Sequence, residues 1–520
     1  MASPTFWTKN VSFEPFGSFT ATDLCQYLPP NVRVQALLLG SGDPRNILNT
    51  LSLSDPGSRT YDFTCCDQEP AILARSILML SLILDNQPSS IIWDIHYNMR
   101  IDEESSSLLI KQCEKLVSFA ADMTSWRNSP YGKVLRMSTS HTLAAVCRLW
   151  IRYAQFDNHS GPVADQLEGK RKAVALGLNI ISRLGWRVNP SISASPSAGP
   201  FFTYENPLGS VHYNDYWRTG LPAHTLGRKD PPKYLNPTLA FSRTRPEEWP
   251  LLPASDPLKS FHLATAFAGI EGEPTNGACR ANTTMEVLAE TVRKEFDDWC
   301  TSFSSHVRRA PGSIIVRFVV AEAFAFCQAL HYCVSTDGYG PVASGSAPTA
   351  FNVIDSSDLM NSMGLLNILT CASPLLEREP YSALFTEALF SIAGDGTGGT
   401  ALPSRTLTDP SVTALLFGLT PTSFVTKIST QENAHEVLAN LMRGAPKRSD
   451  YYHERLVWKF VHSGDQGALR DVEALDRRIV VDPEQLSKTL FAIYQNMFQP
   501  ENPPSGDKRG LPGTSKAGYS

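Results

Sequence analysis

Two apolar runs near the beginning of the chain predict buried strands, each followed by a helix. The first run, residues 32–39, ends in a Gly-Ser-Gly turn at 40–42 and continues into helix-forming residues. The second run, residues 61–66, is followed by a helical pattern over 70–80 that begins with proline. Continuous apolar runs of this length are typical of strands in a parallel sheet. The alternation of strand and helix therefore predicts a right-handed crossover and a doubly wound sheet.

Parallel-sheet character returns after a long interval. Residues 313–321 (SIIVRFVVA) and 350–357 (AFNVIDSS) are β-rich apolar runs, and helical patterns follow both. The segments between them and the opening unit are mostly amphipathic helices and loops rich in proline and aromatic residues. We therefore expect an α/β fold with a doubly wound, mainly parallel Rossmann-like sheet, split by a large and mostly helical insertion. A helical C-terminal region, with one helix expected over 381–393, completes the prediction.

These patterns divide the chain into five predicted parts. They are the first part of the Rossmann-like domain (1–90), the insertion (91–310), the second part of that domain (311–380), the helical C-terminal region (381–498) and a disordered tail (499–520).

Composition narrows the class of protein. The net charge of −5 over 520 residues gives no basic footprint for nucleic acid. No apolar segment is long enough to cross a bilayer, and no signal peptide is recognisable at the N-terminus, so we expect a cytoplasmic protein without membrane contact. The ten cysteines form no C-x-x-C pair and fall on apolar patterns, which favours buried thiols and predicts no metal site.

The glycine turn and the end of the second strand offer a specific chemistry. Gly40 and Gly42 allow the main chain to approach a ligand closely, and the following helix presents unpaired N–H groups. Asp67 ends the second strand, where a carboxylate accepts hydrogen bonds from ribose hydroxyls. The third glycine of G-x-G-x-x-G is missing, so we expect the turn to bind a pyrophosphate poorly. S-adenosylmethionine has no phosphate and needs only a looser Gly-x-Gly turn. The alternative is an α/β core whose turn needs glycine for backbone reasons alone.

The ends of the later strands supply further candidates. In a methyltransferase-like sheet the third strand ends near the adenine and the fourth near the transferred methyl group. Glu322 follows the third predicted strand, and Asp355 and Ser356 end the fourth. We therefore expect Glu322, Asp355 and Ser356 to join Gly40, Gly42 and Asp67 in binding the cofactor, while the catalytic residues stay unknown.

Several segments together resemble a large fungal family of uncharacterised proteins. The N-terminal domain of that family is shared with a dynein axonemal assembly factor that carries a methyltransferase-like domain. The segments are YDFTCCDQEPAILARSILMLSLI, the most distinctive, with LLLGSGDPRNIL, SPYGKVLRMSTSHTL, DPLKSFHLATAFA, FNVIDSSDLMNSMGLLNILTCASPLL and LSKTLFAIYQNMF. Members of the family often end in a MYND zinc finger, and this sequence contains no such Cys/His cluster.

The resemblance implies a methyltransferase-like fold, and three functions remain open. The first is a non-catalytic scaffold or assembly factor that binds a protein partner. The second is an active S-adenosylmethionine-dependent methyltransferase acting on a small-molecule acceptor or a protein. The third is another transferase that uses an adenosine-containing substrate on the same sheet. Fold alone does not decide between them, because function depends on the site.

Overall fold

The structure is a computed structural model of the whole chain. It describes residues 13–17, 20–156, most of 165–176, 216–222, 232–242, 251, 257–261, 285–335, 347–357, 359–391, 410–422 and 451–460. Of the predicted helical C-terminal region (381–498), residues 392–409, 423–450 and 461–498 lie outside these residues, as does the predicted tail 499–520.

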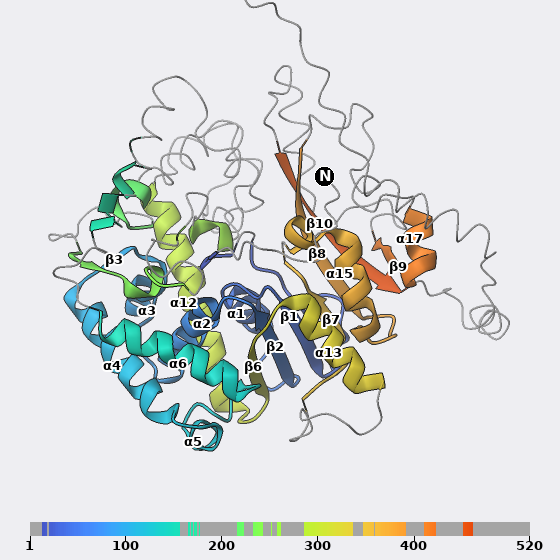
Figure 1. The fold of residues 1–520 in the computed structure, drawn as a ribbon, viewed down its shortest axis with the longest axis horizontal. Helices are drawn as coiled ribbons and strands as arrows, with labels where there is room; N and C mark the ends of the chain where they lie inside the picture. The colour runs from blue at the N-terminus through green and yellow to red at the C-terminus, as the bar shows by residue number, and fades with distance from the viewer. Residues whose placement is uncertain are drawn as a thin grey trace, which may run out of the picture.

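A largely parallel sheet of eight strands runs through the described part of the chain (Figure 1). Its order is β4-β6-β2-β1-β7-β8-β10-β9, in which β10 runs antiparallel to both of its neighbours. The strands are β1 (Val34–Leu39), β2 (Tyr61–Asp67), β4 (Leu135–Met137), β6 (Ile314–Val320), β7 (Val353–Asp355), β8 (Ala383–Ser391), β9 (Leu419–Pro421) and β10 (Tyr451–Phe460). A separate pair joins β3 (Arg100–Ile101) to β5 (Tyr234–Leu235).

Helices cover both faces of the sheet (Figure 1). The first face carries α1 (Arg45–Ser52), α2 (Pro70–Leu84), α3 (Ser89–Tyr97), α4 (Glu103–Phe119), α5 (Met123–Asn128), α6 (Ser140–Ala154) and α12 (Met285–Arg309). The second face carries α13 (Ala323–Ser335), α14 (Leu359–Met363) and α15 (Leu365–Ala372). Short 3-10 helices occur at η1 (Pro237–Leu239), η2 (Pro257–Ser260) and η4 (Ser373–Leu375), and α17 (Pro410–Phe417) adjoins β9.

The two faces of β1 explain why its sequence is continuously apolar. Val34, Ala36 and Leu38 belong to the core beneath α1 and α2, whereas Leu37 and Leu39 belong to the core beneath α13 and α15. Successive side chains of a strand point to opposite faces, so a strand that is covered on both sides needs apolar residues throughout. The mixed α/β architecture and the parallel pairing of β1 with β2 are therefore as predicted.

The described part of the C-terminal region contains strands as well as a helix. The helix expected over 381–393 is wrong, because Ala383–Ser391 forms β8 between β7 and β10. Its apolar residues are spaced in a way that fits a helix, but an inner strand buried on both faces also lacks alternation. Strands β9 and β10 likewise extend the sheet, and α17 is the helix described within residues 381–498.

The predicted insertion, residues 91–310, also contributes to the main sheet. Strand β4 pairs in parallel with β6, with Leu135 opposite Val316 and Met137 opposite Phe318. Helix α12 packs against α1 and α3 on the first face. The described residues of this segment include the helices α3, α4, α5, α6 and α12, and these helices share the hydrophobic core of the sheet.

Two further predictions concern thiols and the membrane. The eight cysteines described by the structure are unpaired thiols, and all of them except Cys147 are buried. Within the described ranges, no helix has both the length and the apolar character needed to span a bilayer.

Candidate functional site

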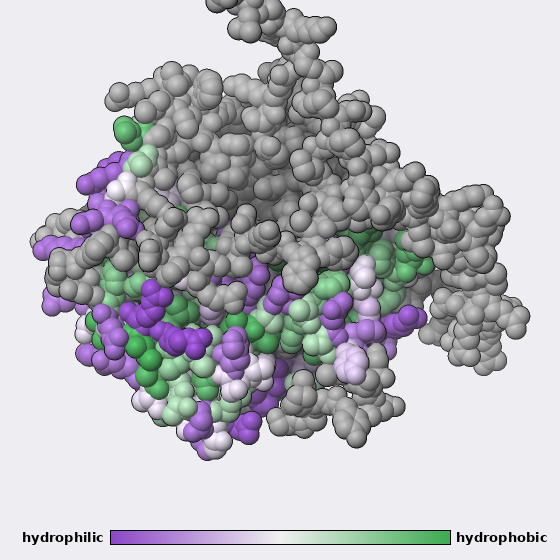
Figure 2. Space-filling model, viewed as in Figure 1, coloured by the Kyte–Doolittle hydropathy of each residue, from purple (hydrophilic) through white to green (hydrophobic). Residues whose placement is uncertain are grey.

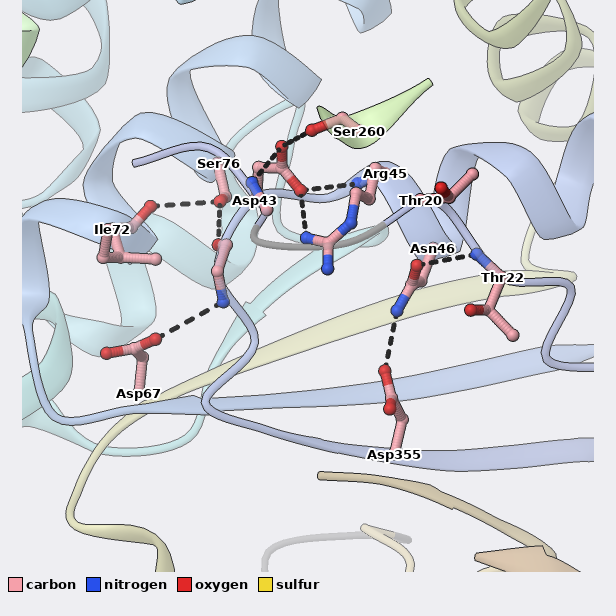
Figure 3. A network of polar contacts seen from close by, with 12 residues as sticks. Thr20, Thr22, Asp43, Arg45, Asn46, Asp67, Ile72, Ser76, Ser260 and Asp355 are labelled. Atoms are coloured by element: carbon pink, nitrogen blue, oxygen red, sulfur yellow. Dashed lines mark hydrogen bonds and ion pairs between the residues drawn. The ribbon is translucent and has the colours of Figure 1, made fainter. Parts of the chain in front are cut away.

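The glycine turn and the end of β2 come together at the carboxyl edge of the sheet. Gly40 and Gly42 have φ angles of 60° and 57°, in the left-handed region that favours glycine. The N–H of Gly42 donates to Oδ2 of Asp67 over 3.4 Å (Figure 3). The N–H of Ser41 donates to the carbonyl of Cys66 over 3.1 Å. Three of the predicted site residues are therefore neighbours.

Asp67 sits in an environment that disfavours its charge. Burial raises its pKa to about 7, against the N–H groups of Glu69 and Gly42, which favour the ionised form. The N–H of Glu69 donates to Oδ1 over 2.9 Å. The residue is still partly exposed, as are Gly40, Ser41 and Gly42. Asp67 can therefore accept hydrogen bonds from ribose hydroxyls. Its charge changes near neutral pH.

Glu322 is near this group but has a role in the helix that follows it. Its two carboxylate oxygens accept hydrogen bonds from the N–H groups of Phe324 (3.1 Å) and Ala325 (2.7 Å). It thereby satisfies unpaired donors in the first turn of α13. The N–H of Ala321 donates to the carbonyl of Asp67 over 3.0 Å, so the ends of β2 and β6 adjoin. Glu322 is partly exposed and capable of an adenine contact only at the expense of this cap.

Asp355 and Ser356 lie on the other side of β1 and are buried. Asp355 accepts a hydrogen bond of 2.7 Å from the amide of Asn46 and one of 3.0 Å from the N–H of Ser357 (Figure 3 shows the first). The hydroxyl of Ser356 donates to the carbonyl of Phe385 over 3.1 Å. Ser357 itself has a φ of 47°, a strained conformation for a residue with a β-carbon. These groups are occupied by contacts within the protein.

Asp43 is a buried carboxylate that joins several segments of the site, and the sequence alone did not indicate this role. Its carboxylate pairs with Arg45 over 2.6 Å and accepts hydrogen bonds from the N–H of Gly17 (3.1 Å) and the hydroxyl of Ser260 (3.0 Å; Figure 3). Burial opposes the charge of Asp43, but the guanidinium of Arg45 outweighs it and the pKa is lowered. The ion pair is thus charged on both sides at neutral pH.

A segment before β1 crosses this edge, and we call residues 13–17 and 20–28 the N-terminal cover. The N–H of Thr22 donates to the side-chain oxygen of Asn46 over 2.9 Å, and the N–H of Leu24 donates to the hydroxyl of Thr50 over 2.9 Å. Asn46 and Thr50 lie one helical turn apart on α1. Both side chains are buried, so the N-terminal cover packs directly on this face of α1.

The cover also reaches the antiparallel end of the sheet. The carbonyl of Thr20 accepts a hydrogen bond of 3.0 Å from Arg455 on β10, and Arg455 forms a buried ion pair with Glu387 on β8. Burial raises the pKa of Glu387, and Arg455 opposes this effect. Neither residue was a candidate from the sequence, because the partners are far apart in the chain.

The edge therefore has two halves with different properties. The half formed by the glycine turn and Asp67 is partly exposed, and it is the part suited to a nucleoside. The half at β7 is buried beneath the N-terminal cover. No cluster of His, Cys, Asp or Glu suited to a metal ion occurs among the described residues.

Comparison with known proteins gives one match. Residues 15–101 match a family described as a domain of unknown function (DUF4470). This stretch contains most of the N-terminal cover, the glycine turn, Asp67 and α2. No curated protein and no solved structure matches the chain. The resemblance to the fungal family and to the dynein assembly factor stays a prediction.

Proposed function

We propose that this chain is a methyltransferase-like protein that acts as a non-catalytic scaffold or assembly factor. Its fold would derive from an S-adenosylmethionine-binding sheet, and its work would be to bind a protein partner. The resemblance to an assembly factor supports this proposal. The residues at the strand ends also support it, because they form contacts within the protein at the place where a methyltransferase would bind its acceptor.

The order of the strands supports a methyltransferase-like fold. Numbered along the chain without β4, the parallel strands lie in the order 3-2-1-4-5, which is the doubly wound order of mononucleotide-binding sheets. The point where this order reverses lies between β1 and β7, where ligands bind in such folds. The reversed strand β10 next to β8 also agrees with a methyltransferase-like sheet.

The observation that carries the proposal is the state of Asp355. This carboxylate is 5% exposed and holds the amide of Asn46 and the N–H of Ser357. A residue that borders a transfer site must meet substrate, because methyl transfer depends on proximity and alignment. The buried contacts of Asp355 replace that function with a structural one. Ser356 is fully buried, which also favours a structural role.

Calorimetric titration with S-adenosylmethionine and S-adenosylhomocysteine tests the proposal. We expect no saturable binding in the micromolar range by the folded wild-type protein. Folding is verified by a cooperative urea transition. Micromolar binding accompanied by methyl transfer to protein or small-molecule acceptors would overturn the non-catalytic proposal.

The second candidate is an active methyltransferase, and a specific observation favours it. Gly40 and Gly42 have the left-handed conformation of a ligand-binding turn, and Asp67 beside them is partly exposed. If this candidate is right, Asp67→Ala abolishes cofactor binding. Asp55→Ala, which changes a carboxylate between α1 and β2 outside the site, serves as the matched control and leaves the affinity unchanged.

The described surface gives no single face for a partner. Figure 2 shows hydrophilic and hydrophobic side chains interspersed over the helices at the lower left of the view. The large apolar side chains that are exposed in the described residues are scattered singly: Leu53, Leu176, Tyr332 and Leu415. Scattered apolar residues are ordinary on protein surfaces, so these four do not mark a docking face.

A further inference from the structure

Arg75 is a buried cation in α2 without an acidic partner. Its residue is 2% exposed, and it donates to the hydroxyl of Thr238 and, over 2.5 Å, to the carbonyl of His96. Both acceptors are neutral groups. No ion pair joins Arg75 to a carboxylate among the described residues. A buried charge is normally paired, so this arrangement lacks the anion that a guanidinium prefers.

Three polar atoms around this guanidinium have no hydrogen-bond partner within the described protein. They are Nε of Arg75, Nε2 of His96 and the hydroxyl of Tyr153. His96 is 3% exposed and Tyr153 is 1% exposed. Most buried polar groups are paired, and each exception calls for a physical reason. Three exceptions at one buried charge indicate a common missing partner.

These atoms come from helices that pack on one another. Arg75 lies on α2, His96 on α3 and Tyr153 on α6. The indole N–H of Trp150, one turn before Tyr153, donates to the carbonyl of Ala74 over 3.1 Å, which places α6 directly beside Arg75. The charge of Arg75 in turn perturbs the pKa of both His96 and Tyr153.

The ionisation of the group favours an anion over a cation. Burial, followed by the nearby Arg75, lowers the pKa of His96 to about 3, so the imidazole is neutral at pH 7. Burial lowers the pKa of Arg75 only to about 10, so the guanidinium stays charged. Asp43, which acts on both residues, is already paired with Arg45, and the buried carboxylate of Glu69 acts on Tyr153.

We propose that Arg75, His96 and Tyr153 form a buried binding site for an oxyanion, either a carboxylate or a phosphate group. The guanidinium supplies the charge, and its Nε–H, the imidazole and the tyrosine hydroxyl supply hydrogen bonds. Carboxylate and phosphate have the same need for a planar cation and several donors. This site is separate from the strand ends considered above and does not depend on the proposed function.

The position of the site links it to the carboxyl edge of the sheet. Ser76, the next residue in α2, donates to the carbonyl of Gly42 over 3.3 Å. The ring of Phe16 from the N-terminal cover lies over Arg75, 5.6 Å from its guanidinium carbon. Arg75 therefore lies against Phe16 of the N-terminal cover, and the next residue of α2 contacts the glycine turn.

Thermal unfolding of the full chain in inorganic phosphate and in acetate tests the proposal. Ionic strength is held constant with sodium chloride, and we expect one or both probes to raise the unfolding midpoint in a saturable way. A response to phosphate indicates a phosphate-bearing ligand, and a response to acetate indicates a carboxylate. Tyr153→Phe removes one donor, so we expect it to weaken the apparent affinity about tenfold.

A matched variant separates binding from stability. The hydroxyl of Tyr61 on β2 is also buried, so Tyr61→Phe removes a buried tyrosine hydroxyl away from Arg75. We expect it to leave the probe affinity unchanged. His96→Phe provides a second loss of a donor at the site if Tyr153→Phe fails to fold. The proposed site would be overturned if neither probe changed the unfolding midpoint of the wild type. It would also be overturned if each probe raised the midpoints of wild type and Tyr153→Phe equally.

Discussion

The side-chain amide of Asn46 donates a hydrogen bond of 2.7 Å to the carboxylate of Asp355, and this contact joins α1 to the end of β7. The same side chain accepts the N–H of Thr22 over 2.9 Å. Asn46 thus connects three segments: the N-terminal cover, the first helix and the fourth parallel strand. Because all of these groups are buried, the connection stabilises the fold at the edge where a ligand was expected.

Substitution of Asn46 should reveal the cost of this connection. Asn46→Ala removes both hydrogen bonds and leaves a buried carboxylate short of a donor, so we expect a loss of about 1–3 kcal/mol in the free energy of unfolding. Asn46→Asp removes the donor and places a second carboxylate against Asp355, so it should cost more than Asn46→Ala at pH 7. Urea unfolding at pH 7 measures both effects. Equal losses of Asn46→Asp and Asn46→Ala would contradict the contact.

Gly40 should tolerate a β-carbon poorly for two separable reasons. Its φ of 60° strains any other residue, and an added β-carbon would lie 2.9 Å from Cγ of Leu359. Gly312 has a φ of 85° and no atom within 4 Å of such a β-carbon. We expect backbone strain in Gly312→Ala to lower the free energy of unfolding by about 1–3 kcal/mol, and we expect a larger loss in Gly40→Ala. Urea denaturation of both variants compares them, and equal losses would rule out the contact with Leu359.

Glu322 should behave as a helix cap and not as a ligand. Glu322→Ala removes the acceptors for the N–H groups of Phe324 and Ala325, so we expect a loss of about 0.5–2 kcal/mol in the free energy of unfolding. Glu114→Ala, at an exposed position of α4, is the control and should change stability by less than about 0.5 kcal/mol. Chemical denaturation measures both. A stable Glu322→Ala variant would show that the cap is dispensable.

The parts of the site that are local in sequence were predictable, and the parts that depend on distant contacts were not. The turn at Gly40 and Gly42 and the acid at Asp67 follow from one strand-helix-strand pattern, and the structure brings them together. The partner of Asp355 is 309 residues away, so no spacing rule indicates Asn46. The identity of Asp355 was thus visible in the sequence, but its structural role was not.

The same distinction explains the error in the sheet. Strand β8 lies between β7 and β10, and its first residues pack on both faces of the sheet, with Ala383 and Phe385 on one side and Leu384 on the other. Periodicity does not separate such a strand from a buried helix of similar length. The pairing that decides the outcome involves β10, whose Tyr451 is opposite Ser391. Only the tertiary structure supplies that partner.

Asp67 should make the stability of the protein depend on pH. Its folded pKa of about 7 lies above the ordinary value of 3.8, so the native state binds more protons than the unfolded state between these values. The associated stability is present below about pH 4 and is lost as the pH rises through about 7. Asp67→Asn removes this titration while retaining an acceptor for the N–H of Glu69. We therefore expect the variant to gain about 1–2 kcal/mol relative to wild type on going from pH 4 to pH 8, a value reduced for solvent screening.

The control for this prediction is a carboxyl group that is shifted in the opposite direction. Hydrogen bonds from Ser125 and Thr124 lower the pKa of Asp122 at the start of α5. Asp122→Asn should therefore lose stability relative to wild type by an amount that stays nearly constant from pH 4 to pH 8, because the folded pKa of Asp122 lies below its ordinary value of 3.8. Urea unfolding from pH 4 to pH 8 compares the two variants. A constant difference between Asp67→Asn and wild type across this range would show that Asp67 does not titrate near neutral pH.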